Sequence, residues 1–264
     1  MSLFIRVLGD SSHLGPTIVL VHGFMGDHRD FLPLAEELAS EGYRLVLFDL
    51  PGHGASSLAG LGPNFEEACL WIWQQLQAHL KGDVYVVGYS LGGRIALSWK
   101  IMFDRDISLL VLESSSFGIQ NLEERQQRLL KDQKLLGAVT TGVQSFKSFL
   151  DAWYRLPLFA GLGASPYYQE MLARRQTQNP HSLQIALDTF SVGNMRSLWT
   201  HLDRLSGGLM YLSGGEDKKY TNFGQNLPQS WLHKVVCQAS HNIHGQCPKL
   251  FSQQLREFLK LLQN

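Results

Sequence analysis

A serine flanked by glycines stands where a strand-like run meets a helical pattern. Residues 84–97 read VYVVGYSLGGRIAL, so Gly88, Ser90 and Gly92 form a G-x-S-x-G motif. A sharp strand-to-helix turn strains such a serine and presents its hydroxyl above the sheet, and small neighbours prevent collisions there. Because a serine hydroxyl is a weak nucleophile and a weak base, it needs a histidine to accept its proton and an acid to orient that histidine.

The best-placed histidine is His241, in the segment CQASHNIHGQ between a predicted strand and the last predicted helix. A loop at the carboxyl end of a parallel strand reaches the crevice where open α/β sheets bind ligands. Asp217 follows the preceding strand in MYLSGGEDKKY, which gives the order serine, acid, histidine expected of this architecture. We therefore predict that Ser90, Asp217 and His241 act as a catalytic triad. The alternative partners are His244, Glu216 and Glu113.

Backbone N–H groups near the serine can stabilise negative charge. The segment VLVHGFMGD closes a strand at His22, and the loop after it supplies one donor, which we assign to the N–H of Phe24. The N–H of Leu91, at the start of the following helix, is the second donor. We expect His22 to be structural, and likewise His53 and Ser56 in the loop DLPGHGASS.

Arg94 lies in the first turn of the helix that follows the serine. A cation there opposes the helix dipole at a cost of about 0.3–1 kcal/mol, and helical side chains lean back toward the N-terminus. Its guanidinium can therefore reach the mouth of the serine site, where its fork would bind a substrate carboxylate. The alternative is an ion pair that only braces the sheet.

More arginines follow in a stretch of helical patterns. GIQNLEERQQRLLKDQ contains Arg128, and MLARRQTQ contains Arg174 and Arg175. Most helix arginines are solvated or paired locally, so each is weak evidence by itself. Together with Arg94, they indicate a cationic cap over an apolar pocket, and thus a small substrate with several carboxylates.

Short β-branched runs alternate with helical patterns on both sides of this stretch. The predicted strands cover residues 3–8, 17–22, 44–50, 84–90, 109–115, 207–214 and 232–238. The predicted helices cover residues 30–42, 64–80, 94–103, 220–227 and 248–263. This alternation predicts an α/β fold whose mostly parallel sheet has helices on both faces.

Between residues 118 and 195 the strand-like runs disappear. Amphipathic helical patterns take their place at residues 121–136, 145–156 and 166–178. We expect residues 118–195 to be a helical lid insertion that divides the core into residues 1–117 and 196–264.

Composition narrows the function classes. A chain of 264 residues with 44% hydrophobic content can bury a large core. Lys plus Arg and Asp plus Glu both number 23, so no overall field attracts nucleic acid or an anionic membrane. We see no long apolar run or leader segment, and the three cysteines lack C-x-x-C spacing, which favours a reducing cytoplasm. Without clustered metal ligands, a P-loop or a dinucleotide fingerprint, we expect no metal and no organic cofactor.

The segments HGF, DLPGHGASS, GYSLGG, GGED and SHN together resemble the α/β-hydrolase fold family over nearly the whole chain. These motifs are specific for the fold and the triad. They do not specify a substrate, because the same scaffold hosts esterases, lyases, peroxidases and catalytically silent receptors.

A narrower resemblance is to the 2-succinyl-6-hydroxy-2,4-cyclohexadiene-1-carboxylate synthases (MenH) of menaquinone biosynthesis. The similar segments are VGYSLGGR, GIQNLEERQQR, FLDAWYRLPLFAGL and SHNIH, whereas ESSSFGIQ departs from a Gly-rich stretch with His-Pro. For this chain, the resemblance implies the triad Ser90, Asp217 and His241, the carboxylate ligands Arg94, Arg128 and Arg175, and the pocket residues Tyr89 and Trp153. Arg174 stays open as the alternative to Arg175.

The same resemblance implies a lyase reaction without a cofactor. Pyruvate would be eliminated from 2-succinyl-5-enolpyruvyl-6-hydroxy-3-cyclohexene-1-carboxylate, with Ser90 removing a ring proton after activation by His241. Two alternatives remain open. One is a serine hydrolase of a carboxylate-bearing ester, thioester or C–C bond, and the other is a non-catalytic binding protein with this fold. The expected partner is a small polycarboxylate, and the oligomeric state stays open.

Overall fold

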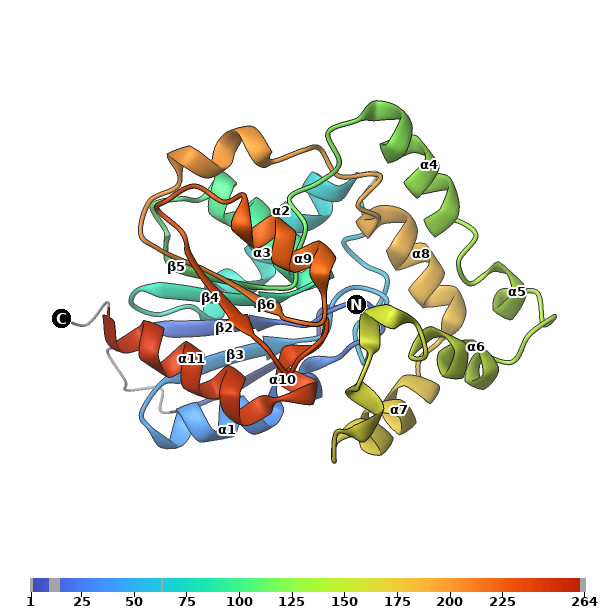
Figure 1. Cartoon of the computed structure of the whole chain (residues 1–264), viewed down its shortest axis with the longest axis horizontal. Coiled ribbons are helices and arrows are strands. Elements are labelled where there is room, and N and C mark those ends of the chain that lie inside the picture. Colours follow the sequence, from blue (N-terminus) through green and yellow to red (C-terminus); the bar gives the residue numbers. More distant parts are fainter. Residues whose placement is uncertain (1, 10–14, 63, 262–264) are drawn as a thin grey trace.

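A single sheet organises the molecule (Figure 1). The computed structural model describes residues 2–9, 15–62 and 64–261. Within them the strands are β1 (Ile5–Leu8), β2 (Thr17–Val21), β3 (Arg44–Phe48), β4 (Val84–Tyr89), β5 (Ile107–Glu113), β6 (Gly208–Gly214) and β7 (Leu232–Val236). Their order is β1-β3-β2-β4-β5-β6-β7, and every neighbouring pair is parallel except β1 with β3. The predicted α/β class with a mostly parallel sheet is confirmed.

Helices cover both faces of this sheet. They are α1 (Leu32–Ser40) and α11 (Pro248–Leu261) on one face, and α2 (Phe65–Leu76), α3 (Leu91–Met102) and α9 (Lys218–Gln225) on the other (Figure 1). Side chains alternate along β2: Ile18 and Leu20 pack with α1 and α11, whereas Val19 and Val21 pack with α2 and α3. Two separate apolar cores therefore hold the sheet from both sides.

A run of helices connects β5 to β6. It contains α4 (Leu122–Asp132), α5 (Gly137–Thr140), α6 (Phe146–Trp153), α7 (Tyr168–Gln176) and α8 (Pro180–Phe190), with short 3-10 turns between them. These helices gather beyond one end of the sheet (Figure 1). A third apolar cluster joins them to Met25, in the loop after β2. Because β2 runs parallel to β4, these helices lie over the carboxyl ends of both strands.

The sequence located most of these elements. Each predicted strand overlaps an observed one, but the helix α8 was not predicted. It begins at Pro180, and the side chain of Asn179 accepts hydrogen bonds from the backbone N–H groups of His181 and Ser182. No helix of the described residues is long and apolar enough to cross a membrane. Cys69, Cys237 and Cys247 are free thiols.

Candidate active site

The strand-to-helix turn at Ser90 has the strained backbone that the motif predicts. Ser90 lies between β4 and α3 with φ 50° and ψ −106°, a backbone conformation that residues other than glycine rarely adopt. A Cβ on Gly88 would lie 2.6 Å from the carbonyl oxygen of Gly92. A Cβ on Gly92 would collide with the carbonyl oxygen of Val21 on the neighbouring strand. Only glycine fits at either position, so the flanking glycines are a steric requirement of the turn.

Hydrogen bonds from the end of β5 support this turn. The N–H of Ser90 donates to the carbonyl oxygen of Glu113 over 2.9 Å, and the Ser115 hydroxyl donates to the carbonyl oxygen of Ser90 over 3.0 Å. Ser115 is itself held by the hydroxyl of Tyr211, which donates to its carbonyl oxygen. The ESSSFGIQ segment, which departs from the Gly-rich stretch of the similar family, therefore braces the serine.

Ser90, His241 and Asp217 form a hydrogen-bonded chain. The Nε2 of His241 lies 2.9 Å from the Ser90 Oγ, and its Nδ1 lies 2.8 Å from an Asp217 carboxylate oxygen. His241 and Asp217 are both buried, and the second carboxylate oxygen of Asp217 accepts the N–H of Tyr220 at the start of α9. With Nδ1 protonated toward Asp217, the Nε2 lone pair of His241 faces the serine hydroxyl. This arrangement can move a proton from Ser90 to His241.

The alternative acid and histidine partners have other positions. His244 directs its Nδ1 to a carboxylate oxygen of Glu113 over 2.7 Å. The other oxygen of Glu113 accepts the N–H groups of Ile243 and His244. Glu216 is exposed to solvent. Glu113 and His244 thus form their own buried side-chain pair, and among the described residues no side chain of these three alternatives hydrogen-bonds to Ser90 or His241.

His22 links two loops, as the structural interpretation predicts. Its Nδ1–H donates to the carbonyl oxygen of Gly23, and its Nε2 accepts the N–H of Leu50 over 2.9 Å. Burial lowers the pKa of His22 below its ordinary value and keeps the ring neutral. Burial likewise lowers the pKa of His53 to about 3. The Ser56 hydroxyl donates to the carbonyl oxygen of Asp49, so it also fixes its loop.

The serine and the histidine open into one cavity of about 220 Å³. The sequence-derived residues that line it are Phe24, Tyr89, Ser90, Leu91, Arg94, Arg128, Trp153, Arg175 and His241. Of the predicted site residues, only Asp217 does not line the cavity, and it hydrogen-bonds to His241 behind the wall. Leu91 is the first residue of α3, where N–H groups have no intrahelical acceptor. The cavity thus brings together both assigned oxyanion donors, the reactive pair and three arginines.

Several lining residues were not identified from the sequence. The ring of Tyr220 lies 4.5 Å from that of His241, centroid to centroid, and Phe159 approaches the same imidazole edge-on at 5.9 Å. The N–H of His241 also donates to the carbonyl oxygen of Leu158, between α6 and α7. Only the position of Tyr220, one turn after Asp217, offered a signal. Leu158 and Phe159 lie between β5 and β6, in the helical segment whose docking the sequence does not specify.

Arg94 is a buried cation that forms no ion pair with a carboxylate of the described residues. Its side chain is 8% exposed, and its Nε has no hydrogen-bond partner among the described residues. Burial, together with the charge of Arg128, lowers the pKa of Arg94 to about 10. The described part of the chain therefore does not show the alternative, an ion pair of Arg94 that braces the sheet. A buried guanidinium in this state is ready to accept an anion.

Arg128 and Arg175, in contrast, each pair with a buried carboxylate. The Nε of Arg128 donates to Asp132 over 2.8 Å within α4. Arg175 donates from Nη2 to Asp30 over 2.5 Å and from Nε to the hydroxyl of Tyr154 over 3.3 Å. Its Nη1 is buried and has no partner among the residues described. Arg175 therefore keeps a free donor although its charge is balanced.

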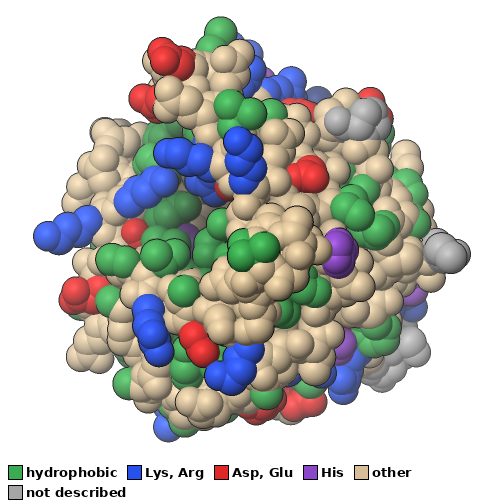
Figure 2. All heavy atoms as spheres, turned by 90° about the vertical axis from the view of Figure 1, so that its right-hand side faces the viewer, with side chains coloured by type: hydrophobic (Ala, Val, Ile, Leu, Met, Phe, Trp, Pro, Cys, Tyr) green, Lys and Arg blue, Asp and Glu red, His purple; other side chains and the backbone are tan. Residues whose placement is uncertain are grey.

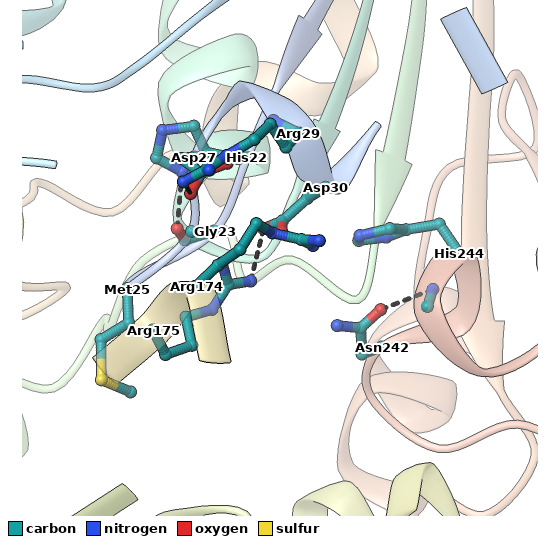
Figure 3. Close-up of polar contacts among 12 residues, drawn as sticks. His22, Gly23, Met25, Asp27, Arg29, Asp30, Arg174, Arg175, Asn242 and His244 are labelled. Carbon is teal, nitrogen blue, oxygen red and sulfur yellow. Dashed lines mark hydrogen bonds and ion pairs between the residues drawn. The ribbon is translucent and has the colours of Figure 1, made fainter. Parts of the chain in front are cut away.

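Arg174 and Arg175 both point from α7 toward Asp30, as Figure 3 shows. Arg174 also pairs with Glu170 over 2.6 Å. It lines a separate cavity of about 180 Å³ that is walled by residues of α1, α7 and α11 and does not contain Ser90. Arg175 is the one that lines the serine cavity, so the structure favours Arg175 over Arg174 as a substrate ligand.

One group of side chains in the described part of the chain has the spacing of a metal site. Ligand atoms of Asp27, His28 and Asp49 lie within 4.8 Å of one another. However, Asp49 accepts from the Nδ1 and the backbone N–H of His28, and Asp27 pairs with Arg29. These groups do not line the serine cavity. Their donor atoms are committed to holding the loop after β2.

Comparison with known proteins agrees with this fold and site. The family model described as the alpha/beta hydrolase fold matches residues 16–161, and the chain belongs to that family. The MenH structure from S. aureus superposes with a TM-score of 0.90 at 28% identity, covering 99% of both chains. A thermophilic esterase from Thermogutta terrifontis shares the fold, with a TM-score of 0.77 at 20% identity over 99% of this chain and 94% of the esterase.

Sequence relatives define a narrower group. The 2-succinyl-6-hydroxy-2,4-cyclohexadiene-1-carboxylate synthase of Yersinia pseudotuberculosis (serotype O:1b, strain IP 31758) is 34% identical over 250 residues, covering 94% of this chain and 88% of the relative. The synthase of the same name from Yersinia pestis (bv. Antiqua, strain Nepal516) is 35% identical over 254 residues, with the same coverage. Within the hydrolase fold, the chain is a member of this synthase family of lyases.

Proposed function

We propose that the chain eliminates pyruvate from 2-succinyl-5-enolpyruvyl-6-hydroxy-3-cyclohexene-1-carboxylate, the reaction that yields the product named in its relatives. The observation that carries this proposal is the shared cavity of Ser90, His241, Arg94, Arg128 and Arg175. A substrate with three carboxylates matches three convergent guanidinium groups, which recognise carboxylates in a planar, bidentate manner. An ester hydrolase with an apolar substrate would gain nothing from the uncompensated charge of Arg94.

The proposed reaction begins with proton removal. The substrate carbon between the succinyl carbonyl and the ring double bond carries an acidic hydrogen, because its carbanion is conjugated with both groups. The Oγ of Ser90 takes this proton while its own proton passes to the Nε2 of His241, 2.9 Å away. The Asp217 carboxylate, at 2.8 Å from Nδ1, stabilises the imidazolium that forms.

Electrons then move through the ring to the leaving group. The C–H bond breaks and a new ring double bond forms beside the succinyl carbonyl, while the original double bond shifts by one carbon. The C–O bond to the enolpyruvyl group breaks, and the departing enolate takes up a proton to become pyruvate. Charge that develops on the succinyl oxygen would be stabilised by the N–H groups of Phe24 and Leu91. Water is not consumed.

The helices of residues 118–195 support this chemistry as a proposed lid. They contribute Arg128, Trp153 and Arg175 to the cavity wall, and the Leu158 carbonyl accepts the N–H of His241. A lid that shields the cavity would keep water from competing and would strengthen the arginine–carboxylate interactions. We also propose a cytoplasmic site of action, which suits the three free cysteines.

An oxygen-18 experiment distinguishes this lyase from a serine hydrolase. The protein is incubated with the enolpyruvyl substrate in oxygen-18 water, and released pyruvate is trapped at once by reduction to lactate. The Ser90→Ala variant and an enzyme-free sample are the controls. Elimination gives pyruvate and cyclohexadiene in equal amounts, without enzyme-dependent oxygen-18 in the succinyl carboxylate or the ring. Solvent oxygen in the product, or ester cleavage without pyruvate release, would establish the hydrolase instead.

A further inference from the structure

Lys219 is a fourth cation at the serine cavity, beyond the three arginines. It lies in the first turn of α9, two residues after Asp217, and its side chain is exposed at the cavity wall. Its Nζ lies 5.5 Å from the ring centroid of Tyr220 and 5.9 Å from that of Phe223. These rings hold the ammonium group over the apolar wall. Lys218, the adjacent lysine, does not line the cavity.

Lys219, Arg94 and Arg128 come from three different elements and repel one another. Partial desolvation at the cavity wall and the charges of Arg128 and Arg94 lower the pKa of Lys219, although the neighbouring Asp217 carboxylate acts to raise it. Burial and the charge of Arg128 lower the pKa of Arg94 as well. Of these three cations, only Arg128 has an ion pair with a carboxylate among the described residues. The protein therefore places more positive than negative charge on this wall.

The surface of the molecule near the cavity also carries more positive than negative side chains. Figure 2 shows Lys and Arg side chains gathered beside an apolar hollow on the face that carries the lid helices. On the wall formed by α7, Asp30 balances the charge of Arg175. In Figure 1, α7 lies in the lower part of the view, and α4 and α9 lie above it. The cavity is thus electrostatically asymmetric, with the unbalanced charge near Arg94 and Lys219.

We propose that Lys219 completes, with Arg94 and Arg128, a subsite for one carboxylate of the substrate, and that it determines specificity for that carboxylate. This inference rests on the proposed function. It adds Lys219 to the substrate-binding residues and requires that the side chain at this position carry a positive charge. A bound carboxylate would relieve the repulsion among the three cations, so binding is stronger than one contact alone would give. Because Lys219 takes no part in the hydrogen bonds that join Ser90, His241 and Asp217, its effect should fall on KM rather than on kcat.

The test compares Lys219→Met with Lys218→Met, the matched change of the adjacent exposed lysine. Methionine keeps the length of the side chain without its charge. We expect Lys219→Met to raise KM about tenfold with kcat within about twofold of wild type, since the variant loses a charge-assisted contact whose strength is reduced by exposure at the rim. Lys219→Arg should restore most of the binding. Lys218→Met should stay within about twofold of wild type.

A binding measurement separates this proposal from the proposed function. Calorimetric titration with 2-succinylbenzoate, an aromatic compound with the same ring carboxylate and succinyl group, reports affinity without turnover. Weaker binding by Lys219→Met than by Lys218→Met, with a smaller dependence on salt, supports the subsite even if wild type releases no pyruvate. Equal affinity and equal KM for the two methionine variants, or a loss confined to kcat, would overturn it. Thermal unfolding of each variant verifies that the fold is kept.

Discussion

Glu113 accepts the N–H of Ser90 at its backbone carbonyl, over 2.9 Å. Its carboxylate, fully buried, accepts the N–H groups of Ile243 and His244 over 2.6 Å and 3.0 Å. A single residue at the end of β5 therefore joins the turn of the serine to the segment that directly follows His241. Since His244 stacks on Phe31 with 4.3 Å between ring centroids, this segment is held from two sides. The link fixes the separation of Ser90 and His241.

Replacement of Glu113 by glutamine should reduce turnover. The amide keeps the shape of the side chain but has only one oxygen, so if that oxygen accepts the two backbone N–H groups, its NH₂ group faces the Nδ1 of His244. This buried network must then rearrange, at a cost of about 1–3 kcal/mol. A displacement of His241 by about 1 Å would lower kcat on the order of 10²-fold. We expect kcat to fall with KM nearly unchanged. Steady-state pyruvate release measures both, and Glu216→Gln, at an exposed site, is the control. A rise in KM at constant kcat would contradict a positioning role.

Ser90 and His241 should behave as one catalytic unit. Either alanine variant interrupts the same proton transfer, so the second substitution has little left to remove. We expect Ser90→Ala and His241→Ala each to reduce kcat by at least about 10³-fold, and the double variant to be no worse than about the poorer single variant. Stopped pyruvate assays with high enzyme concentrations give the three values. Two large losses that multiply in the double variant would show that the residues act independently.

The close approach of Ser90, Asp217 and His241 was predictable because the order of the strands constrains where these residues lie. Ser90, Asp217 and His241 each follow a strand, and parallel strands bring their carboxyl ends to one edge. Arg94 could be recognised because a cation in the first helical turn opposes the dipole. The pair of Asp30 and Arg175 could not be foreseen, since 145 residues separate them and no local pattern links the loop after β2 to α7. The packing of α7 against that loop depends on tertiary contacts, and so does the position of α8.

Lys219 was missed for a different reason. In GGEDKKY, two lysines at a helix start look like solvated surface charge, and the sequence does not show which of them faces inward. The side on which Lys219 lies is set by the rotation of α9 about its axis, and Phe223 of that helix packs against the apolar core. The charge of Lys219 can be assigned to the serine cavity only once the positions of Arg94 and Arg128 in the fold are known.

Arg94→Lys should fold normally and react poorly. Lysine keeps the charge but cannot form the bidentate fork, and removing a good contact to a buried charge costs about 2–5 kcal/mol. We expect kcat/KM to fall by about 30-fold or more, as about 1.4 kcal/mol corresponds to a factor of ten. Arg174→Lys is the matched control, because Arg174 faces the other cavity and pairs with Glu170. Equal kcat/KM for both variants would remove Arg94 from substrate binding.

Asp30→Asn should destabilise the protein in a pH-dependent way. Although burial alone would raise the pKa of Asp30, the neighbouring Arg175 holds it below its ordinary value. The stability that this carboxylate contributes is therefore fully present above the pKa of the unfolded chain, near 3.8, and is lost as pH falls through the lower folded pKa. The asparagine variant leaves Arg175 buried without its counter-charge, at a cost of about 3–5 kcal/mol.

Urea unfolding across a pH series measures this difference. The gap in unfolding free energy between wild type and Asp30→Asn should be constant from about pH 7 to pH 5 and should shrink below about pH 4, where the Asp30 carboxylate of the unfolded wild-type chain begins to take up protons. Asp151→Asn is the matched control. Asp151 pairs with Lys147 at the surface, where such pairs contribute about 0–1 kcal/mol, so that gap should be small at every pH. A gap for Asp30→Asn that grows on acidification would mean that Arg175 does not stabilise the charged form of Asp30.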